Sequence, residues 1–333
     1  MSVAGPGTVD LPPFVPRWGL SNGHLMTVFA WARARAYPGL PEPEARLFQT
    51  TPDTRVLGHA YWQPDRQMRP TLVALHGLEG SSSGHYMRGL AHQAWQRGWN
   101  AVLLNQRNCG GTEHLTPTLY HSGLTEDAFA VIGQLAAEGL PHFGVAGYSL
   151  GGNVTLRMAG EFATVPARTD LPIRAFAAVS PTMDLQVCID AIERLANVPY
   201  EWNFLNGLRA RMRRKAALWP GHFDLAPLGR IRSIRAFDDT YTAPLAGFGN
   251  ATNYYFQASA MRLIDRVTAP TLVVSAEDDP FVPGEQFRRP QVAGNANVRV
   301  VLPADGGHCG FVSDAGYWAE ETVVRFLAAF MPS

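Results

Sequence analysis

The segment Gly147-Tyr148-Ser149-Leu150-Gly151 carries the residue types needed for nucleophilic catalysis at a sharp turn. It follows an apolar run at residues 143–146 and precedes a segment with helical character at residues 152–159. A serine between two glycines in this setting is the G-x-S-x-G pattern of a nucleophile elbow, in which a strained turn presents the hydroxyl. The N-terminus of the following helix would stabilise negative charge beside the serine. The pattern therefore predicts Ser149 as a nucleophile.

His308 and Asp279 are the candidates for the base and the acid that would activate this serine. A serine hydroxyl needs a neighbouring base, and the base needs an acid that holds its tautomer; on sheets with a nucleophile elbow the chain order is serine, acid, histidine. His308 lies in a glycine-rich loop after the last predicted strand, and Asp278 and Asp279 follow the penultimate one. We favour Asp279, because the residue before a proline is held extended. We interpret Asp278 as a solvated turn residue.

The backbone N–H groups of Leu78 and Leu150 are the candidates for an oxyanion hole. Acyl transfer needs donors aimed at the oxygen that becomes negative, and each donor is worth on the order of 3 kcal/mol of barrier. Leu150 directly follows the candidate nucleophile, and Leu78 lies in the loop after the first buried strand. His76 and Glu79 lie in the same loop. We leave both out of the triad and expect His76 to order the loop by hydrogen bonding.

An alternation of strands and helices predicts the sheet that would hold these residues. Strands are expected at 71–75, 101–104, 143–146, 173–179, 271–275 and 298–302, and helices at 85–97, 125–138, 152–159, 284–289 and 314–330. This order means right-handed crossovers and a parallel sheet with helices on both faces. Because chemistry in such sheets occurs at the carboxyl ends of the strands, the elbow, the His76 turn and the loop at 105–108 should share one rim.

Two segments before the first buried strand are expected to lie outside this alternation. Residues 1–44 are rich in proline and glycine and should form an N-terminal arm with a short helix at 26–35. Apolar and polar residues alternate at 46–50 and at 55–62. This pattern predicts an antiparallel hairpin at the edge of the sheet.

The alternation stops near residue 181 and resumes at 270, which predicts an inserted helical cap at 181–258. The core domain would then comprise residues 45–180 and 259–333. The cap is rich in aromatic residues, which fit either an apolar pocket for an acyl chain or the cap's own core. A basic run fits either a seat for a substrate phosphate or carboxylate or, as we favour, a solvated helix face; it consists of Arg209, Arg211, Arg213, Arg214 and Lys215.

Composition excludes several classes of function. Lys+Arg and Asp+Glu both number 28, so the formal net charge is zero and no long-range field would recruit nucleic acid. The widely spaced Cys109, Cys188 and Cys309 suggest neither a disulfide framework nor a metal site, and we expect no metal and no cofactor. No signal segment and no apolar run of about 18 residues is evident, so we expect a cytoplasmic protein. The oligomeric state is left open.

Motifs spread over residues 17–312 give the chain a specific resemblance. They are LSNGHLMT (20–27), HGLEGS (76–81), NQRNCGG (105–111), YHSGLTED (120–127), GYSLGG (147–152), FDDTYTAP (237–244), DDPF (278–281) and GGH (306–308). In these segments the chain resembles the YheT-like branch of the α/β-hydrolase superfamily, whose relatives include plant embryogenesis-associated proteins and eukaryotic membrane-anchored lipid hydrolases. The chain departs from that family at Gly23, often a proline, and near Asn108, often a glycine or serine.

The resemblance implies an α/β-hydrolase fold, a mostly parallel central sheet flanked by helices with an inserted helical cap. It implies the triad roles for Ser149, Asp279 and His308 and the oxyanion role for the N–H groups of Leu78 and Leu150. A small-molecule ester or lipid is then the expected partner, as for an acylglycerol lipase. The eukaryotic relatives carry an N-terminal membrane anchor that this chain lacks, so we expect no stable attachment to a membrane.

Three hypotheses on function remain at this point. The first is a serine carboxylesterase acting on short- to medium-chain esters through an acyl-enzyme. The second is a non-catalytic protein that binds acyl chains or lipids in the same pocket. The third is another reaction of the same triad, such as amide or C–C bond hydrolysis, because a fold and a triad do not choose the leaving group.

Overall fold

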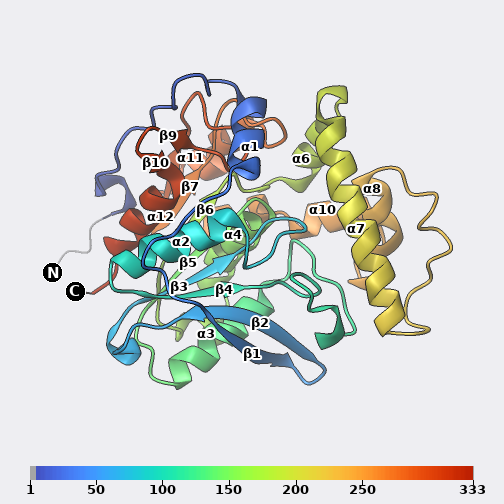
Figure 1. The fold of residues 1–333 in the computed structure, drawn as a ribbon, viewed down its shortest axis with the longest axis horizontal. Helices are drawn as coiled ribbons and strands as arrows, with labels where there is room; N and C mark the ends of the chain where they lie inside the picture. The colour runs from blue at the N-terminus through green and yellow to red at the C-terminus, as the bar shows by residue number, and fades with distance from the viewer. Residues whose placement is uncertain (1–4, 333) are drawn as a thin grey trace.

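The computed structural model describes residues 5–332, and a mostly parallel sheet forms their centre (Figure 1). Its eight strands follow the order β1-β2-β4-β3-β5-β6-β7-β8. Strands β1 and β2 form an antiparallel edge, β2 pairs antiparallel with β4, and the rest of the sheet is parallel. The strands are β1 (Glu44–Thr51), β2 (Thr54–Tyr61), β3 (Thr71–Leu75), β4 (Asn100–Leu104), β5 (Phe143–Tyr148), β6 (Ile173–Val179), β7 (Thr271–Val274) and β8 (Val298–Val301). The predicted fold class is confirmed.

Helices cover both faces of the sheet, as the alternation of strands and helices predicts. The longer core helices are α2 (His85–Gln96), α3 (Glu126–Ala137), α4 (Leu150–Phe162) and α12 (Trp318–Ala328). Successive residues of a strand point to opposite faces. In β3, Leu72 therefore joins the apolar cluster under α2 and α12, whereas Val73 joins the cluster under α3 and α4. This two-sided burial explains why β3 is a continuous apolar run.

Three predicted helices differ from the observed ones for local reasons. Helix α1 (Gly23–Ala32) begins three residues early, because the side chain of Asn22 accepts a hydrogen bond from the N–H of Leu25 and caps it. Helix α12 begins late, because a short hairpin, β9 (Val312–Ser313) with β10 (Gly316–Tyr317), occupies the predicted start. The predicted helix at 284–289 is a 3-10 helix. None of these differences moves a strand end at the rim.

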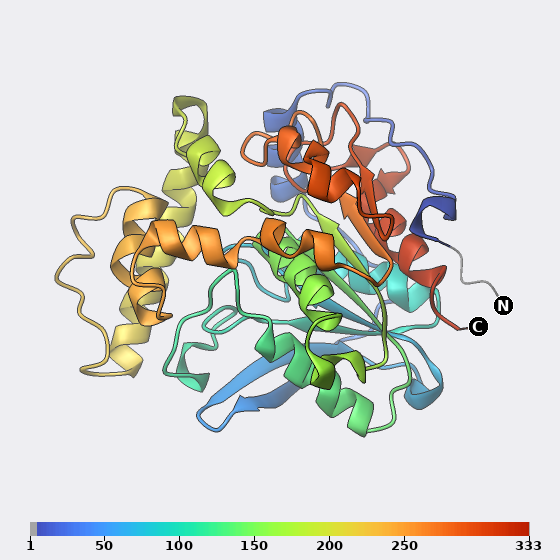
Figure 2. The same cartoon turned by 180° about the vertical axis from the view of Figure 1, so that it is seen from behind.

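A group of helices between β6 and β7 lies at one side of the sheet (Figures 1 and 2). These are α6 (Leu185–Ile192), α7 (Val198–Leu218), α8 (Ile234–Phe237), α9 (Ala243–Leu245) and α10 (Ala251–Ala258). Their helical character agrees with the expectation for this part of the chain. The exact division into core and cap at residues 181 and 258 stays a prediction.

The basic run on α7 holds this helix against the core, and the prediction of a solvated face is wrong for its inward side. Arg211 is buried and forms an ion pair of 2.9 Å with Glu79. Lys215 is fully buried and donates to the carbonyl oxygens of Glu113 and Thr116. Arg213 is exposed, as predicted. Sequence spacing alone did not reveal that the inward positions of this helix meet carboxylates and carbonyls of the core.

Candidate active site

Ser149 occupies a strained turn between the end of β5 and the start of α4. Its φ of 53° and ψ of −119° fall in a backbone region that residues other than glycine rarely adopt. The flanking glycines make the turn possible: a Cβ on Gly147 would lie 2.1 Å from the carbonyl oxygen of Gly151, and a Cβ on Gly151 would lie 2.4 Å from that of Leu75. The predicted elbow geometry is therefore present.

Asp279 and His308 are joined by a hydrogen bond of 2.9 Å between Oδ2 of the aspartate and Nδ1 of the histidine. The other oxygen of Asp279 accepts the N–H groups of Phe281 at 3.1 Å and Val282 at 2.9 Å. The aspartate side chain is inaccessible to solvent and that of the histidine is 9% exposed. When Nδ1 donates to the carboxylate, Nε2 is left as a proton acceptor. This arrangement suits a general base.

The electrostatic surroundings of His308 favour its protonated form. Burial lowers the pKa of His308, but the charge of Asp279, the neighbouring Cys309 sulfur and the hydrogen bond to the carboxylate outweigh burial and raise this pKa above its ordinary value of 6.5. Only the neutral ring can take a proton from the serine, so the raised pKa moves the pH range in which His308 acts as a base upward.

The loop carrying His308 is held by the N-terminal arm, a contribution that sequence reasoning missed. The N–H of His308 donates to the hydroxyl of Thr27 at 2.8 Å, and this hydroxyl donates to the carbonyl oxygen of Gly23 at 2.6 Å. The N–H of Gly307 donates to Asp278 at 2.8 Å, and burial raises the pKa of that aspartate. Asp278 is thus not a solvated turn residue. The LSNGHLMT motif was the available signal for Thr27.

The N–H groups of Leu78 and Leu150 are free to donate. Within the described part of the chain, neither amide donates a hydrogen bond to another residue, and both residues line a pocket with Ser149. The loop of Leu78 lies against the elbow, since a Cβ on Gly77 would be 3.1 Å from the Cβ of Ser149. Free N–H groups beside a candidate nucleophile are what an oxyanion hole requires.

His76 orders this loop, as predicted. Its Nδ1 bonds the carbonyl oxygen of Gly77 at 2.8 Å, and its Nε2 accepts the N–H of Gln106 at 3.1 Å. Burial lowers the pKa of His76 to about 4. The neutral ring, with Nδ1 as the donor, satisfies both contacts and has no nitrogen left for catalysis.

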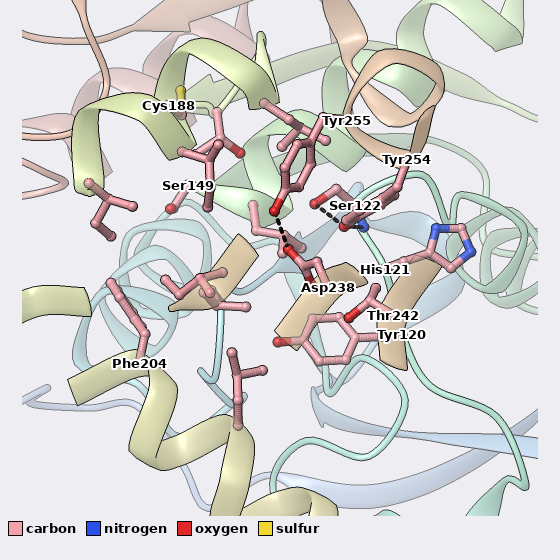
Figure 3. Close-up of a pocket in the computed structure, with 18 of the residues that line it drawn as sticks. Tyr120, His121, Ser122, Ser149, Cys188, Phe204, Asp238, Thr242, Tyr254 and Tyr255 are labelled. Carbon is pink, nitrogen blue, oxygen red and sulfur yellow. Dashed lines mark hydrogen bonds between the residues drawn. The ribbon is translucent and has the colours of Figure 1, made fainter. Parts of the chain in front are cut away.

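The pocket beside Ser149 lies between the core and the helices of residues 185–258 (Figure 3). Its cavity volume is about 90 Å³. Apolar walls include Leu78, Leu150, Leu185, Ile189, Phe204 and Phe281, and polar walls include Tyr120, His121, Ser122, Asp238, Thr242 and Tyr255. The pocket therefore has both an apolar and a polar part.

The aromatic residues of the predicted cap divide between the two alternatives left open by the sequence. Phe204 and Tyr255 line the pocket. Phe237 and Tyr241 pack against each other in the interior with ring centroids 5.2 Å apart. Trp202 belongs to neither group, since 65% of it is exposed.

The structure brings the candidate triad to one rim but does not close all of its contacts. Phe281 links the parts, because its ring lies 4.0 Å from that of His308 and also lines the pocket of Ser149. Across the described residues, no hydrogen bond joins the hydroxyl of Ser149 to His308. Catalytic contacts are often long before substrate binds and tighten in the reacting complex.

No group of three or more His, Cys, Asp or Glu side chains within residues 5–332 could hold a metal ion. No helix in the part of the chain that the structure describes is long and apolar enough to cross a membrane.

Comparison with known proteins identifies the family. Residues 70–315 match the family model described as alpha/beta hydrolase fold. The chain belongs to this family. Over 325 residues it is 34% identical to the Escherichia coli (strain K12) protein named "Putative esterase YheT", covering 96% of this chain and 94% of that protein. The chain thus falls in the YheT-like branch, and the resemblance seen in its motifs is confirmed.

Other relatives in this branch are named as lipid hydrolases. The chain is 31% identical to a mouse protein named phospholipase ABHD3, over 77% of this chain and 61% of that protein. It is 29% identical to the monoacylglycerol lipase of Saccharomyces cerevisiae, over 82% of this chain and 63% of the lipase. The chain therefore spans a little under two thirds of these two relatives.

Solved structures show the same fold at low sequence identity. The esterase Pf2001 of Pyrococcus furiosus superposes with a TM-score of 0.61 at 16% identity, covering 98% of each chain. The 2,6-dihydroxy-pseudo-oxynicotine hydrolase superposes with a TM-score of 0.59 at 15% identity, covering 92% of this chain and 72% of the hydrolase. These likenesses support the fold assignment alone.

Proposed function

We propose that the protein is a serine hydrolase that cleaves carboxylic esters through an acyl-enzyme intermediate. Ser149 attacks the ester carbonyl, and His308 takes the proton from its hydroxyl and later gives it to the leaving alcohol. Asp279 orients the imidazole and stabilises its protonated form. The N–H groups of Leu78 and Leu150 stabilise the oxyanion. Water, activated by the same histidine, then releases the acid.

The observation that carries this proposal is the buried bond between Asp279 and His308 on the rim where the strained Ser149 turn lies. Both features cost free energy in the folded protein, and strained backbone of this kind clusters at active sites. Free N–H groups at two positions of the same pocket add the remaining element of acyl transfer. The names of the relatives YheT and monoacylglycerol lipase agree with hydrolysis of an ester.

The size and lining of the pocket support short- to medium-chain acyl groups as substrates. Each methylene that leaves water contributes about 0.8 kcal/mol, and leucine, isoleucine and phenylalanine side chains surround the space next to Ser149. A cavity of about 90 Å³ leaves little room for a long chain in this conformation.

A labelling and turnover experiment tests the proposal. Wild-type protein is expected to hydrolyse p-nitrophenyl esters from acetate to octanoate and to react with a fluorophosphonate probe. Ser149→Ala should lose both, with a fall in kcat of about 10⁶ as for other serine nucleophiles, while its melting temperature is retained. Ser83→Ala changes an exposed serine of a nearby loop and serves as the matched control.

The same experiment separates the other hypotheses. Tight binding of an ester without labelling or turnover would indicate a binding protein instead of an enzyme. Labelling of Ser149 with turnover of amides or C–C substrates, but not of esters, would keep the triad and replace the reaction.

A further inference from the structure

A cluster of polar side chains on the wall of the Ser149 pocket has no part in ester hydrolysis as proposed above. It consists of Asp238, Thr242 and Tyr255 from the helices between β6 and β7, together with Tyr120 from the core. Figure 3 shows these side chains gathered at a different part of the pocket from Ser149. Asp238 and Thr242 belong to the FDDTYTAP motif, to which the triad assigns no role.

The backbone explains why this motif presents two polar side chains to the pocket. Residues Asp238–Thr242 form a π-helix that continues α8. Such wide turns are rare and occur frequently at functional sites. Asp238 and Thr242 line the pocket, whereas Phe237 and Tyr241 pack together in the interior. The turn thus separates a polar face from an apolar one.

The carboxylate of Asp238 is buried and accepts fewer hydrogen bonds than it can. Its Oδ2 accepts the hydroxyl of Tyr255 at 2.8 Å, and Thr242 lines the same wall of the pocket. An ionised carboxylate can accept about four hydrogen bonds. Within residues 5–332, no cationic side chain lies within 4.0 Å of Asp238. Burial raises the pKa of Asp238 to about 6, so the group is largely ionised above that pH.

The cations and titratable groups nearest to Asp238 have other partners or are neutral. Arg211 is paired with Glu79 at 2.9 Å. Arg235 is paired with Asp190 at 2.6 Å and with Glu193 at 2.7 Å. Burial lowers the pKa of His121, on the same wall, to about 4, so this ring is uncharged. Asp238 lines the pocket and has acceptor positions beyond the one that Tyr255 fills, so a ligand in the pocket can supply a further donor.

We infer that Asp238, with Tyr255 beside it, forms a subsite that accepts a hydrogen bond from a hydroxyl group of the substrate. The subsite deepens the proposed ester hydrolysis and rests on it, because it adds a requirement for a hydroxyl away from the ester that is cleaved. A neutral hydroxyl is sufficient as the donor, because Arg211 and Arg235 already favour the ionised form of Asp238 from a distance.

Matched ester pairs test the subsite through the ratio of their kcat/KM values. On the acyl side the pair is p-nitrophenyl 6-hydroxyhexanoate and p-nitrophenyl heptanoate, in which a hydroxyl replaces a methyl group. On the alcohol side it is 6-hydroxyhexyl butyrate and heptyl butyrate. We expect wild-type protein to prefer the hydroxylated ester in one series. Asp238→Ala should reduce that preference roughly 10- to 100-fold, the range of a hydrogen bond to a charged group.

Asp239→Asn is the matched control, because Asp239 is exposed and its Oδ1 accepts the N–H of Ala251, at the start of α10. It should leave the preference unchanged. The ratio should also be larger at pH 8 than at pH 5, since the ionised carboxylate is the stronger acceptor. The ionisation of His308 affects both esters equally and cancels. Equal losses for both esters in Asp238→Ala, or a preference for the 6-ammoniohexanoate ester, would overturn the inference.

A binding measurement keeps this test separate from the proposed hydrolysis. Calorimetry on Ser149→Ala compares the Kd of methyl 6-hydroxyhexanoate with that of methyl heptanoate, and the Kd of 6-hydroxyhexyl butyrate with that of heptyl butyrate. The same comparisons on Ser149→Ala/Asp238→Ala follow, and the series in which the hydroxyl is preferred is the one that counts. A hydroxyl preference present only in the single variant supports the subsite whether or not wild-type protein turns over esters. The same Kd ratio in both variants rejects it. Absence of ester turnover by wild-type protein rejects the proposed function alone.

Discussion

The rim of the sheet and the helix α7 hold their polar groups in different ways. At the rim, positions follow from backbone geometry: Ser149 sits at a strand end, and Asp279 is held by two N–H groups of its own loop. On α7, long side chains reach across to the core, as Arg211 does to Glu79. The sheet thus places the candidate reacting groups, whereas the pocket wall depends on paired charges between two parts of the chain.

The largest effect expected from this comparison is on the rim, in Asp279→Asn. By analogy with other triads, kcat/KM for p-nitrophenyl butyrate should fall about 10⁴-fold, because the amide favours the wrong tautomer of His308. Loss of the negative charge also lowers the pKa of His308, since burial still opposes its protonation. Only the neutral imidazole is a base, so the acidic limb of the residual kcat/KM profile should move to lower pH.

Asp278→Asn is the matched control for that variant, because Asp278 accepts from Gly307 and does not bond the imidazole. Its acidic limb should lie where that of the wild type lies. If the acidic limb of the kcat/KM profile of Asp279→Asn lay at the same pH as in the wild type, the assignment of Asp279 as the partner of His308 would be contradicted.

An effect on stability is expected when the pair between α7 and the core is broken. Arg211→Met leaves Glu79 without its cation, and removing one partner of a buried ion pair costs about 3–5 kcal/mol. Urea unfolding measures this free energy. Arg211→Met/Glu79→Leu should recover a large part of it, because no charge then stays buried without a partner. A double variant as unstable as the sum of the single ones would contradict this role for the pair.

The smallest effect belongs to the outward side of the same helix. Arg213→Ala removes an exposed guanidinium, and the free energy of unfolding should change by less than about 0.5 kcal/mol. The measurement is again urea unfolding, beside Arg211→Met. A loss comparable to that of Arg211→Met would remove the distinction between the two faces of α7.

The strands and the elbow could be predicted because their signals are local. Thr71–Leu75 is a short, largely apolar run of the kind that a strand buried on both faces shows, and each glycine beside Ser149 occupies a place where a Cβ would collide with backbone atoms. The helix boundaries were less accurate. Helix α12 starts at Trp318 because the preceding residues pair as the hairpin of β9 and β10. The pairing of these two short strands depends on tertiary contacts more than on intrinsic propensity.

In the candidate site too, the residues with local signals could be predicted and those held by distant contacts could not. The residue types in the loops of Asp279 and His308 and their chain order identified this pair, which the structure joins. Thr27 was missed, since its contact with His308 spans 281 residues and the LSNGHLMT motif does not tell which distant residue Thr27 meets. Asp278 was misjudged for the same reason, because the Gly307 N–H that it accepts comes from a distant loop.

The order of strands and helices, the serine turn and the candidates for acid and base can be predicted from residue patterns, because periodicity and glycine placement act over a few residues. The inward orientation of Arg211 and Lys215 and the position of Asp238 on the pocket wall depend on contacts between distant elements. Charged side chains look alike along a chain. A charged side chain is buried only where another element supplies a carboxylate or carbonyl partner, and folding brings the side chain and its partner together.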